Sequence, residues 1–96
     1  MQRCYLVSYD ISDPKRLHRV YQLMRGYGEH WQLSVFFCKL RGIDRVEMES
    51  QLRAEINHSE DQILILDLGP DEEAARKAFT ALGRPLPPPT KNIIVF

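Results

Sequence analysis

The stretch that most constrains the fold is "YLVSYDISDPKR" at residues 5–16, where a strand pattern passes into a helix start within four residues. Residues 3–9 alternate loosely between two faces and are rich in aromatic and β-branched side chains, which predicts a β-strand. Pro14 then suits the first position of a helix, where no backbone N–H is needed. Asp10 therefore stands where an apolar strand ends and a helix is about to begin.

The helix that follows this junction is predicted to be amphipathic. Ser12 or Asp13 can serve as its N-cap. Gly26 and Gly28 are expected to end it. Its apolar side chains recur at helical spacing, with polar ones on the other side: Leu17, Val20, Tyr21 and Met24.

The middle of the chain predicts two more strand regions around a second helix. Residues 31–40 have apolar side chains at both odd and even positions, and so on both faces of a strand. This indicates a strand pair or one long strand covered on both faces. Asp44 and Glu47 form a capping-box pattern, which predicts a helix that ends near Asn57. Residues 63–68, "ILILDL", are a short continuous apolar run and predict a buried strand.

The last third divides into a helix, a spacer and a final strand. Residues 69–83 predict a short third helix, with Gly83 as its stop and an apolar stripe of Ala78, Phe79 and Leu82. Residues 84–96 form a separate segment, in which "RPLPPPT" favours extended polyproline II and "NIIVF" favours a strand. At about 3.1 Å per residue, the spacer can carry this strand about 20 Å, which is enough to reach a partner's sheet.

The order of elements predicts an α+β fold of the ferredoxin-like β-α-β-β-α-β type over residues 1–83. Such a fold has one sheet with helices on one face, and its other face is free for a partner. With 96 residues the chain is also near the lower limit for a single hydrophobic core. A homodimer that exchanges the C-terminal strand is therefore expected.

Composition narrows the class of protein further. No apolar run approaches the length that spans a bilayer, and no leader pattern begins the chain, so we expect a cytoplasmic protein without a membrane partner. Cys4 and Cys38 have no zinc or redox spacing, and we expect buried, reduced thiols. The formal net charge is +0. However, the region before Gly28 carries a basic excess, so a local basic patch is expected.

Asp10 has two interpretations. It can cap a turn or accept a backbone N–H, which is a purely structural role. Alternatively it binds a metal ion. Mg²⁺ keeps several waters and uses one or two carboxylates, so one aspartate per chain suffices if a two-fold axis brings two copies together.

The basic side chains near Asp10 also have two interpretations. They can form a solvated helix face, or they can contact phosphates, for which guanidinium groups are well shaped. The residues concerned are Lys15, Arg16, Arg19 and Arg25. Two further candidates are secondary. The Tyr9 ring is expected to pack in the core, with an orienting role for its hydroxyl beside Asp10 as the alternative, and His30 is a candidate acid–base group.

The motifs together resemble those of the CRISPR-associated Cas2 family. The resemblance rests on the strand that ends in Tyr9-Asp10-Ile11, on the basic helix start after it and on the "QLSVF" strand at residues 32–36. It implies a ferredoxin-like protomer in a symmetric dimer whose C-terminal strand crosses to the partner's sheet. It also implies that the paired Asp10 carboxylates are catalytic and bind Mg²⁺ or Mn²⁺.

The resemblance implies two separable activities. Members of the family are described as metal-dependent nucleases on single-stranded RNA or duplex DNA. The family also forms the central dimer of the spacer-acquisition complex, where it binds duplex DNA and the CRISPR integrase subunit. Family members often carry a basic residue where this chain has His30, and a histidine there makes a weaker, pH-dependent phosphate contact.

Three functions are therefore under consideration. The first is an adaptation protein that binds duplex DNA through the basic residues of its first helix. The second is a Mg²⁺-dependent phosphodiesterase that cleaves single-stranded RNA or duplex DNA. The third is a ferredoxin-like interaction module with no nucleic acid.

Overall fold

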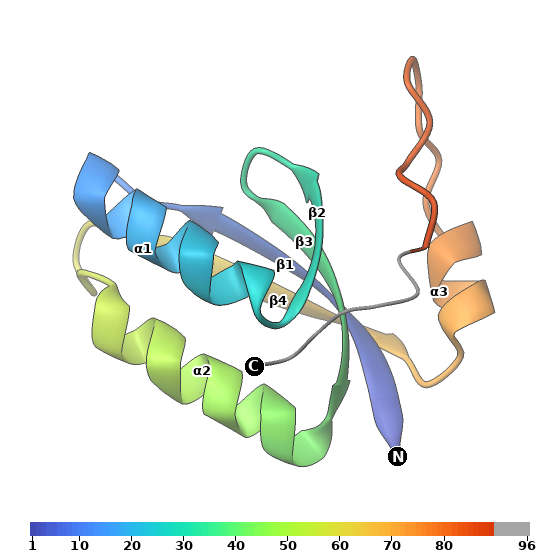
Figure 1. The fold of residues 1–96 in the computed structure, drawn as a ribbon, viewed down its shortest axis with the longest axis horizontal. Helices are drawn as coiled ribbons and strands as arrows, with labels where there is room; N and C mark the ends of the chain where they lie inside the picture. The colour runs from blue at the N-terminus through green and yellow to red at the C-terminus, as the bar shows by residue number, and fades with distance from the viewer. Residues whose placement is uncertain (90–96) are drawn as a thin grey trace.

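A computed structural model describes residues 1–89 of the chain. It contains four strands and three helices (Figure 1). In chain order they are β1 (Gln2–Asp10), α1 (Pro14–Arg25), β2 (Gly28–Gln32), β3 (Val35–Arg41), α2 (Gly42–Glu55), β4 (Gln62–Gly69) and α3 (Glu72–Lys77). The predicted strand at residues 92–96 lies outside the described residues. Within residues 1–89, no helix is long and apolar enough to cross a membrane.

The four strands form one antiparallel sheet in the order β2-β3-β1-β4. Helices α1 and α2 lie side by side across one face of this sheet (Figure 1). This order and layering are those of the predicted ferredoxin-like fold, which is confirmed. β1 is central, and its last residue, Asp10, lies opposite Gln62 of β4.

The main core lies between the sheet and helices α1 and α2. Alternate residues of β1 enter it, namely Tyr5, Val7 and Tyr9. Val20 and Met24 of α1 are fully buried against them. This alternation follows from the period of two along a strand, so the neighbouring residues of β1 face the other side of the sheet.

The other face of the sheet is only partly covered. Ala75 of α3 packs there in a second cluster with Cys4 and Phe37. Farther along the sheet, Leu64 and Leu66 of β4 are 59% and 55% exposed. The expectation that all helices share one face is therefore wrong for α3, while most of the open face remains as predicted.

The start of α1 is as predicted, and the structure decides between its two capping residues. The Asp13 carboxylate accepts a hydrogen bond from the Arg16 backbone N–H at 2.9 Å, and Pro14 follows at the first position. Gly26 is the C-cap. Gly28 does not end the helix but is the first residue of β2. There it lies so close to β3 that a Cβ atom would be 2.5 Å from the Phe37 carbonyl oxygen.

Three other boundaries differ from the prediction. Residues 31–40 are a strand pair, but β2 begins at Gly28 and the two strands join at residues 33–34. Helix α2 begins at Gly42, so the capping box is wrong. Asp44 lies within its first turn and pairs with the Arg41 side chain at 2.9 Å. Helix α3 has only six residues, and Leu82 beyond it is 91% exposed instead of packed.

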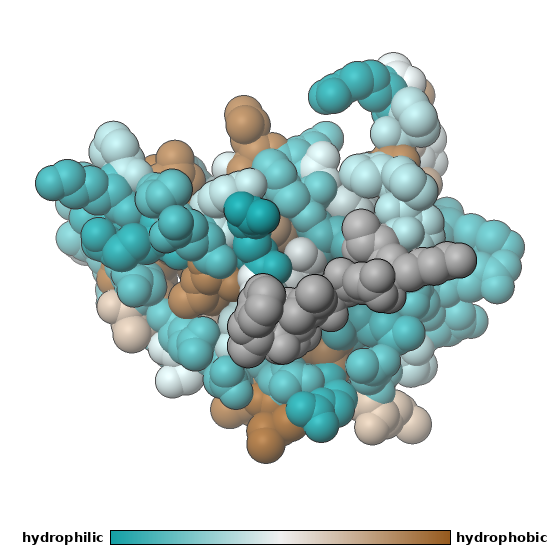
Figure 2. Space-filling model, viewed as in Figure 1, coloured by the Kyte–Doolittle hydropathy of each residue, from teal (hydrophilic) through white to brown (hydrophobic). Residues whose placement is uncertain are grey.

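The side of the molecule seen in Figure 2 is mostly hydrophilic, with hydrophobic residues in separate patches.

Both cysteines are buried and free, as expected. Burial raises the pKa of the Cys38 thiol to about 12. The Cys38 thiol is therefore protonated in the folded chain, whereas metal binding and oxidation both require the thiolate.

Candidate site at the end of the first strand

Asp10 is exposed at the end of the central strand, on the face opposite α1 and α2. Within residues 1–89, no side chain forms a hydrogen bond or an ion pair with its carboxylate. Its two neighbours along the open face of β1 are Ser8 and Leu6, which are half-buried. The Asp10 carboxylate is thus available to a ligand that approaches the open face.

The described residues of one chain contain no group of three or more histidine, cysteine, aspartate or glutamate side chains that could hold a metal ion. A metal site at Asp10 must therefore be completed from outside this part of the chain. Carboxylate oxygen suits Mg²⁺ and Mn²⁺, and Mg²⁺ fills its remaining positions with water and phosphate oxygens. The oxygen donor at Asp10 fits the chemistry of such an ion.

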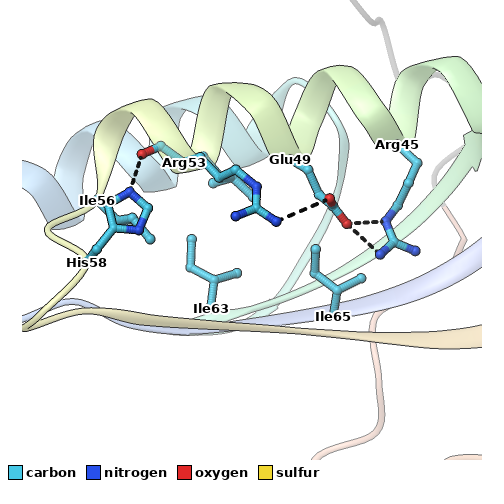
Figure 3. A pocket seen from close by; sticks show the side chains of 8 residues that line it. Arg45, Glu49, Arg53, Ile56, His58, Ile63 and Ile65 are labelled. Carbon is cyan, nitrogen blue, oxygen red and sulfur yellow. Dashed lines mark hydrogen bonds and ion pairs between the residues drawn. The ribbon is translucent and has the colours of Figure 1, made fainter.

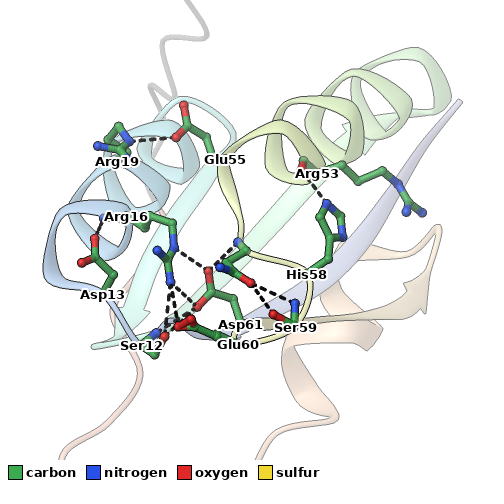
Figure 4. A network of polar contacts seen from close by, with 11 residues as sticks. Ser12, Asp13, Arg16, Arg19, Arg53, Glu55, His58, Ser59, Glu60 and Asp61 are labelled. Atoms are coloured by element: carbon green, nitrogen blue, oxygen red, sulfur yellow. Dashed lines mark hydrogen bonds and ion pairs between the residues drawn. The ribbon is translucent and has the colours of Figure 1, made fainter.

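Arg16 is engaged by an acidic side chain of the same molecule. Its Nε donates to Oδ2 of Asp61 at 2.8 Å, and its Nη2 donates to Oδ1 at 3.2 Å (Figure 4). The Asp61 side chain is completely buried and that of Arg16 is 20% exposed. A phosphate that approached Arg16 would compete with this partner, and phosphate contact by Arg16 remains a prediction.

The other predicted basic residues divide into two kinds. Arg19 donates from Nε to the Glu55 carboxylate at 2.9 Å, and so ties α1 to α2 (Figure 4). Lys15 and Arg25 are exposed, and neither forms an ion pair with the described part of the chain. The Arg25 guanidinium lies 5.8 Å from the centre of the Tyr21 ring. Lys15 and Arg25 therefore present the most accessible positive charge on α1.

Tyr9 and Asp10 are neighbours in sequence but lie on opposite faces of the sheet. The Tyr9 ring is buried and stacks on Phe36, and its hydroxyl donates to the Leu33 carbonyl at 3.4 Å. Burial raises the pKa of this hydroxyl. The ring packs in the core as predicted, and its hydroxyl contacts the turn after β2 instead of Asp10.

His30 lies near the same turn. Its Nε2 is 3.4 Å from the Leu33 carbonyl oxygen, and its ring contacts the rings of Tyr21 and Phe36. The structure thus brings His30 and Tyr9 together, on the side of the sheet away from Asp10. An acid–base role for His30 stays a prediction.

Asp61 was missed by the sequence reasoning. It lies in the segment "HSEDQ", which reads as a polar loop. The signal that could have identified it is its position just before Gln62, the first residue of β4. In a ferredoxin-like order β4 lies beside β1, so the residue that precedes β4 is brought close to the end of β1.

A hollow runs between α2 and β4 at the edge of the sheet (Figure 3). Ile63 and Ile65 of β4 form its floor, and Arg45 and Glu49 form an ion pair on α2 above them. His58 lies at one end, where its Nε2 is 3.0 Å from the Arg53 carbonyl oxygen. Because β4 is an edge strand of the described sheet, its outer backbone groups are available to a further strand.

These features define a class of protein: a ferredoxin-like α+β domain with an exposed carboxylate at the end of its central strand and a half-covered opposite face. The comparisons with known proteins agree. The family model of CRISPR associated protein Cas2 matches residues 3–80. The chain therefore belongs to the CRISPR associated protein Cas2 family.

Individual relatives are similar over most of the chain. A protein of Rhodospirillum rubrum named CRISPR-associated endoribonuclease Cas2 1 is 46% identical over 89 residues, which cover 86% of this chain and 87% of the relative. CRISPR-associated endoribonuclease Cas2 of Geobacter sulfurreducens is 39% identical over 99% of both chains.

Solved structures show the same arrangement. The crystal structure of Streptococcus pyogenes Cas2 at pH 6.5 is 30% identical, with a TM-score of 0.73 over 83% of this chain and 99% of that one. A hypothetical protein, TT1823, from Thermus thermophilus is 29% identical, with a TM-score of 0.78 over 94% of this chain and 100% of that one.

Proposed function

We propose that this protein is a CRISPR-associated endoribonuclease that acts as a symmetric homodimer in the cytoplasm and uses Asp10 of each copy to bind Mg²⁺ or Mn²⁺. The observation that carries the proposal is the exposed Asp10 carboxylate, which faces the half-covered side of the sheet. The names of the relatives from Rhodospirillum rubrum and Geobacter sulfurreducens support an endoribonuclease activity.

The open face supports the dimer. Leu64 and Leu66 project from the same face as Asp10 and are more than half exposed. Exposed leucines in a row on a sheet are typical of a surface that meets another protein. If two copies pack these faces together about a two-fold axis, each copy contributes an Asp10 to the same interface.

The edge of β4 supports exchange of the C-terminal strand. The hollow beside Ile63 and Ile65 is open to a further apolar strand. A strand that adds to an edge gains backbone hydrogen bonds, and its side chains cover those of the edge strand. We propose that residues 92–96 of a partner chain add to this edge.

The metal ion is proposed from the chemistry of the ligand. When bound, a divalent ion activates water and stabilises negative charge on a phosphate. Asp10 would hold the ion on the open face. Lys15 and Arg25 would contribute positive charge that attracts the RNA backbone from α1.

The experiment that tests this proposal is cleavage of single-stranded RNA by Asp10→Ala and Asp10→Asn. Loss of the carboxylate removes a metal ligand, so we expect cleavage to fall by about 100-fold or more, to the level of wild type with chelator. Because Asp10 is exposed, the free energy of unfolding should change by less than about 0.5 kcal/mol. Glu73→Gln, an exposed acidic residue on α3, is the matched control.

Two results would contradict the proposal. One is cleavage by Asp10→Ala at the rate of wild type. The other is cleavage that chelator does not slow, because the ion would then have no part in the reaction.

A second candidate function is that of an adaptation protein, in which the dimer binds duplex DNA beside the CRISPR integrase subunit. The observation in its favour is the accessible charge of Lys15 and Arg25 on α1. Contacts to the DNA backbone make affinity fall steeply with salt. The double variant Lys15→Ala, Arg25→Ala should bind duplex DNA more weakly, and its affinity should depend less steeply on salt concentration. An unchanged salt dependence would exclude DNA contacts by Lys15 and Arg25.

The protein can have both of these functions or only one of them. A chain that cleaves no RNA and binds no duplex DNA would instead be a ferredoxin-like interaction module. Binding measured by fluorescence anisotropy, in parallel with the cleavage assay, separates these outcomes.

A further inference from the structure

The most highly coordinated side chain in the described structure is Asp61, which accepts hydrogen bonds from three other residues (Figure 4). Its Oδ1 accepts from the backbone N–H of Ser12 at 3.0 Å and from the Ser12 hydroxyl at 3.2 Å. Its Oδ2 accepts from Arg16 Nε and from the backbone N–H of Asn57, both at 2.8 Å. The buried carboxylate is thus saturated by donors.

These hydrogen bonds join three segments that meet next to Asp10. Ser12 lies two residues after Asp10, in the turn that leads to α1. Asn57 lies in the loop after α2. Gln62, the residue after Asp61, lies opposite Asp10 in the sheet. Asp61 therefore fixes the backbone just after Asp10, and Gln62 pairs with Asp10 itself in the sheet.

Asp61 carries a negative charge at neutral pH. The Arg16 guanidinium, followed by the backbone N–H groups of Ser12 and Asn57, holds the pKa of the Asp61 carboxyl well below its ordinary range. Burial acts in the opposite direction and is outweighed. The carboxylate thus stays ionised, and hydrogen bonds to an ionised acceptor are the stronger kind.

We propose that Asp61 and Arg16 are positioning residues that hold the turn after β1 in place, so that the Asp10 carboxylate faces the open side of the sheet in one orientation. This inference rests on the proposed function, because it concerns the metal ligand of that site. In this role they act on the ion through the turn that follows Asp10, and not as ligands of the ion. Their contribution is to reduce the freedom that Asp10 loses when it binds the ion.

A control carboxylate lies at the other end of β4, the strand that begins just after Asp61. There Asp67 accepts from Arg3 Nε at 3.0 Å and from the backbone N–H of Gly69 at 2.8 Å. This is again an arginine and a backbone N–H on one carboxylate, yet Asp67 lies on β4 opposite Tyr5, five residues along β1 from Asp10. Asp67 is 44% exposed whereas the Asp61 side chain is buried, so the stability of each variant is measured by urea unfolding and ion binding is compared where both are fully folded. A positioning effect would then appear only at Asp61.

The experiment compares Asp61→Asn with Asp67→Asn in the full-length protein. The free Mn²⁺ signal in electron paramagnetic resonance gives the affinity for the ion, with Asp10→Ala as the baseline. We expect Mn²⁺ affinity to fall about tenfold in Asp61→Asn and to stay within about twofold of wild type in Asp67→Asn. In cleavage assays, the Mg²⁺ concentration for half-maximal rate should rise while KM for RNA stays unchanged.

A milder variant covers the case in which Asp61→Asn does not fold. Ser12→Ala removes the two contacts of the hydroxyl, which donates to Asp61 Oδ1 and accepts from Arg16 Nη2, and keeps the Asp13 cap and the backbone hydrogen bond. Because part of the attachment remains, we expect a decrease in Mn²⁺ affinity of about twofold to threefold.

The outcomes are distinguishable. If Asp10→Ala loses Mn²⁺ binding while Asp61→Asn and Ser12→Ala bind like wild type, the positioning role is wrong and the proposed metal site stands. If Asp10→Ala binds Mn²⁺ as wild type does, the metal site itself is wrong, and the positioning role is overturned with it.

Discussion

Two carboxylates near the end of β1, the buried Asp61 and the exposed Asp10, have different roles. Asp61 is buried and saturated by donors, while Asp10, opposite its neighbour Gln62, is exposed and has no side-chain partner within residues 1–89. A buried ion that loses its partners is strongly unfavourable, whereas an exposed one is already solvated. Stability should therefore depend on Asp61, and ligand binding should depend on Asp10.

The pH dependence of stability should show this role of Asp61. Its pKa is lowered from 3.8 on folding, so its contribution to stability is present above the unfolded pKa and is lost as pH falls through the folded pKa. The difference in unfolding free energy between wild type and Asp61→Asn should be constant above about pH 5 and shrink below about pH 4. Urea unfolding between pH 7 and pH 3 measures it, and a pH-independent difference would contradict the assignment.

The two thiols provide a second test at the level of residues. Burial raises the pKa of Cys38 to about 12 and also raises that of Cys4. Since only thiolate attacks a disulfide reagent, neither thiol should react with Ellman's reagent at pH 8 in the folded protein. Both should react within minutes in urea. Rapid reaction of one thiol in the native protein would show that its surroundings open.

Much of the candidate site could be predicted from single residues, and the part that could not depends on contacts between distant segments. Asp10 was identified because a carboxylate at the end of an apolar strand is unusual. The partners of Arg16 and Arg19 could not be found this way, because each lies more than 30 residues away along the chain. The sequence therefore predicted four accessible positive charges on α1, whereas Arg16 and Arg19 are paired with carboxylates in the structure.

At the scale of elements, the close approach of β2 and β3 depends on a residue without a side chain. A Cβ atom at Gly28 would lie 2.5 Å from both the Cys38 Sγ and the Phe37 carbonyl oxygen. The second of these is backbone and cannot move aside. The strand pair was predicted from its apolar pattern, but the role of Gly28 was not, because close approach is a property of two strands together.

Gly28→Ala should therefore destabilise the protein by about 1–3 kcal/mol, as overpacking between strands does. The control is Gly42→Ala at the first position of α2, where a Cβ atom would meet nothing within 4 Å. That variant should be neutral or up to about 1 kcal/mol more stable, because alanine favours a helix over glycine. Urea unfolding of both variants decides, and equal effects would contradict the packing argument.

At the scale of the whole molecule, the order of strands and helices was predictable, while the placement of α3 was not. Periodicity identifies which residues of an element are apolar, and it does not identify which face of the sheet they will cover. Ala75 packs with Cys4 and Phe37, on the side opposite α1 and α2. The open face is consequently smaller than predicted and lies around Leu64 and Leu66.

The proposed dimer gives this smaller face a measurable role. Burial of the exposed half of Leu66 stabilises by about 1 kcal/mol per copy, and a two-fold axis counts each substitution twice. Leu66→Ser should therefore weaken the dimer roughly thirtyfold, as measured by sedimentation at several concentrations. Ile43→Ser, which alters a 70% exposed residue of α2, should leave the dimer unchanged. If both variants behave alike, the dimer uses another surface.

The alternation of β1 has a consequence for how this sequence can change over generations. Tyr9 belongs to the core and Asp10 to the open face because they are consecutive residues of one strand. Insertion or deletion of one residue in β1 would exchange the two faces, so that a carboxylate entered the core and a tyrosine took the ligand position. Length variation among descendants of this chain should thus be confined to loops such as residues 33–34, while β1 keeps a fixed length.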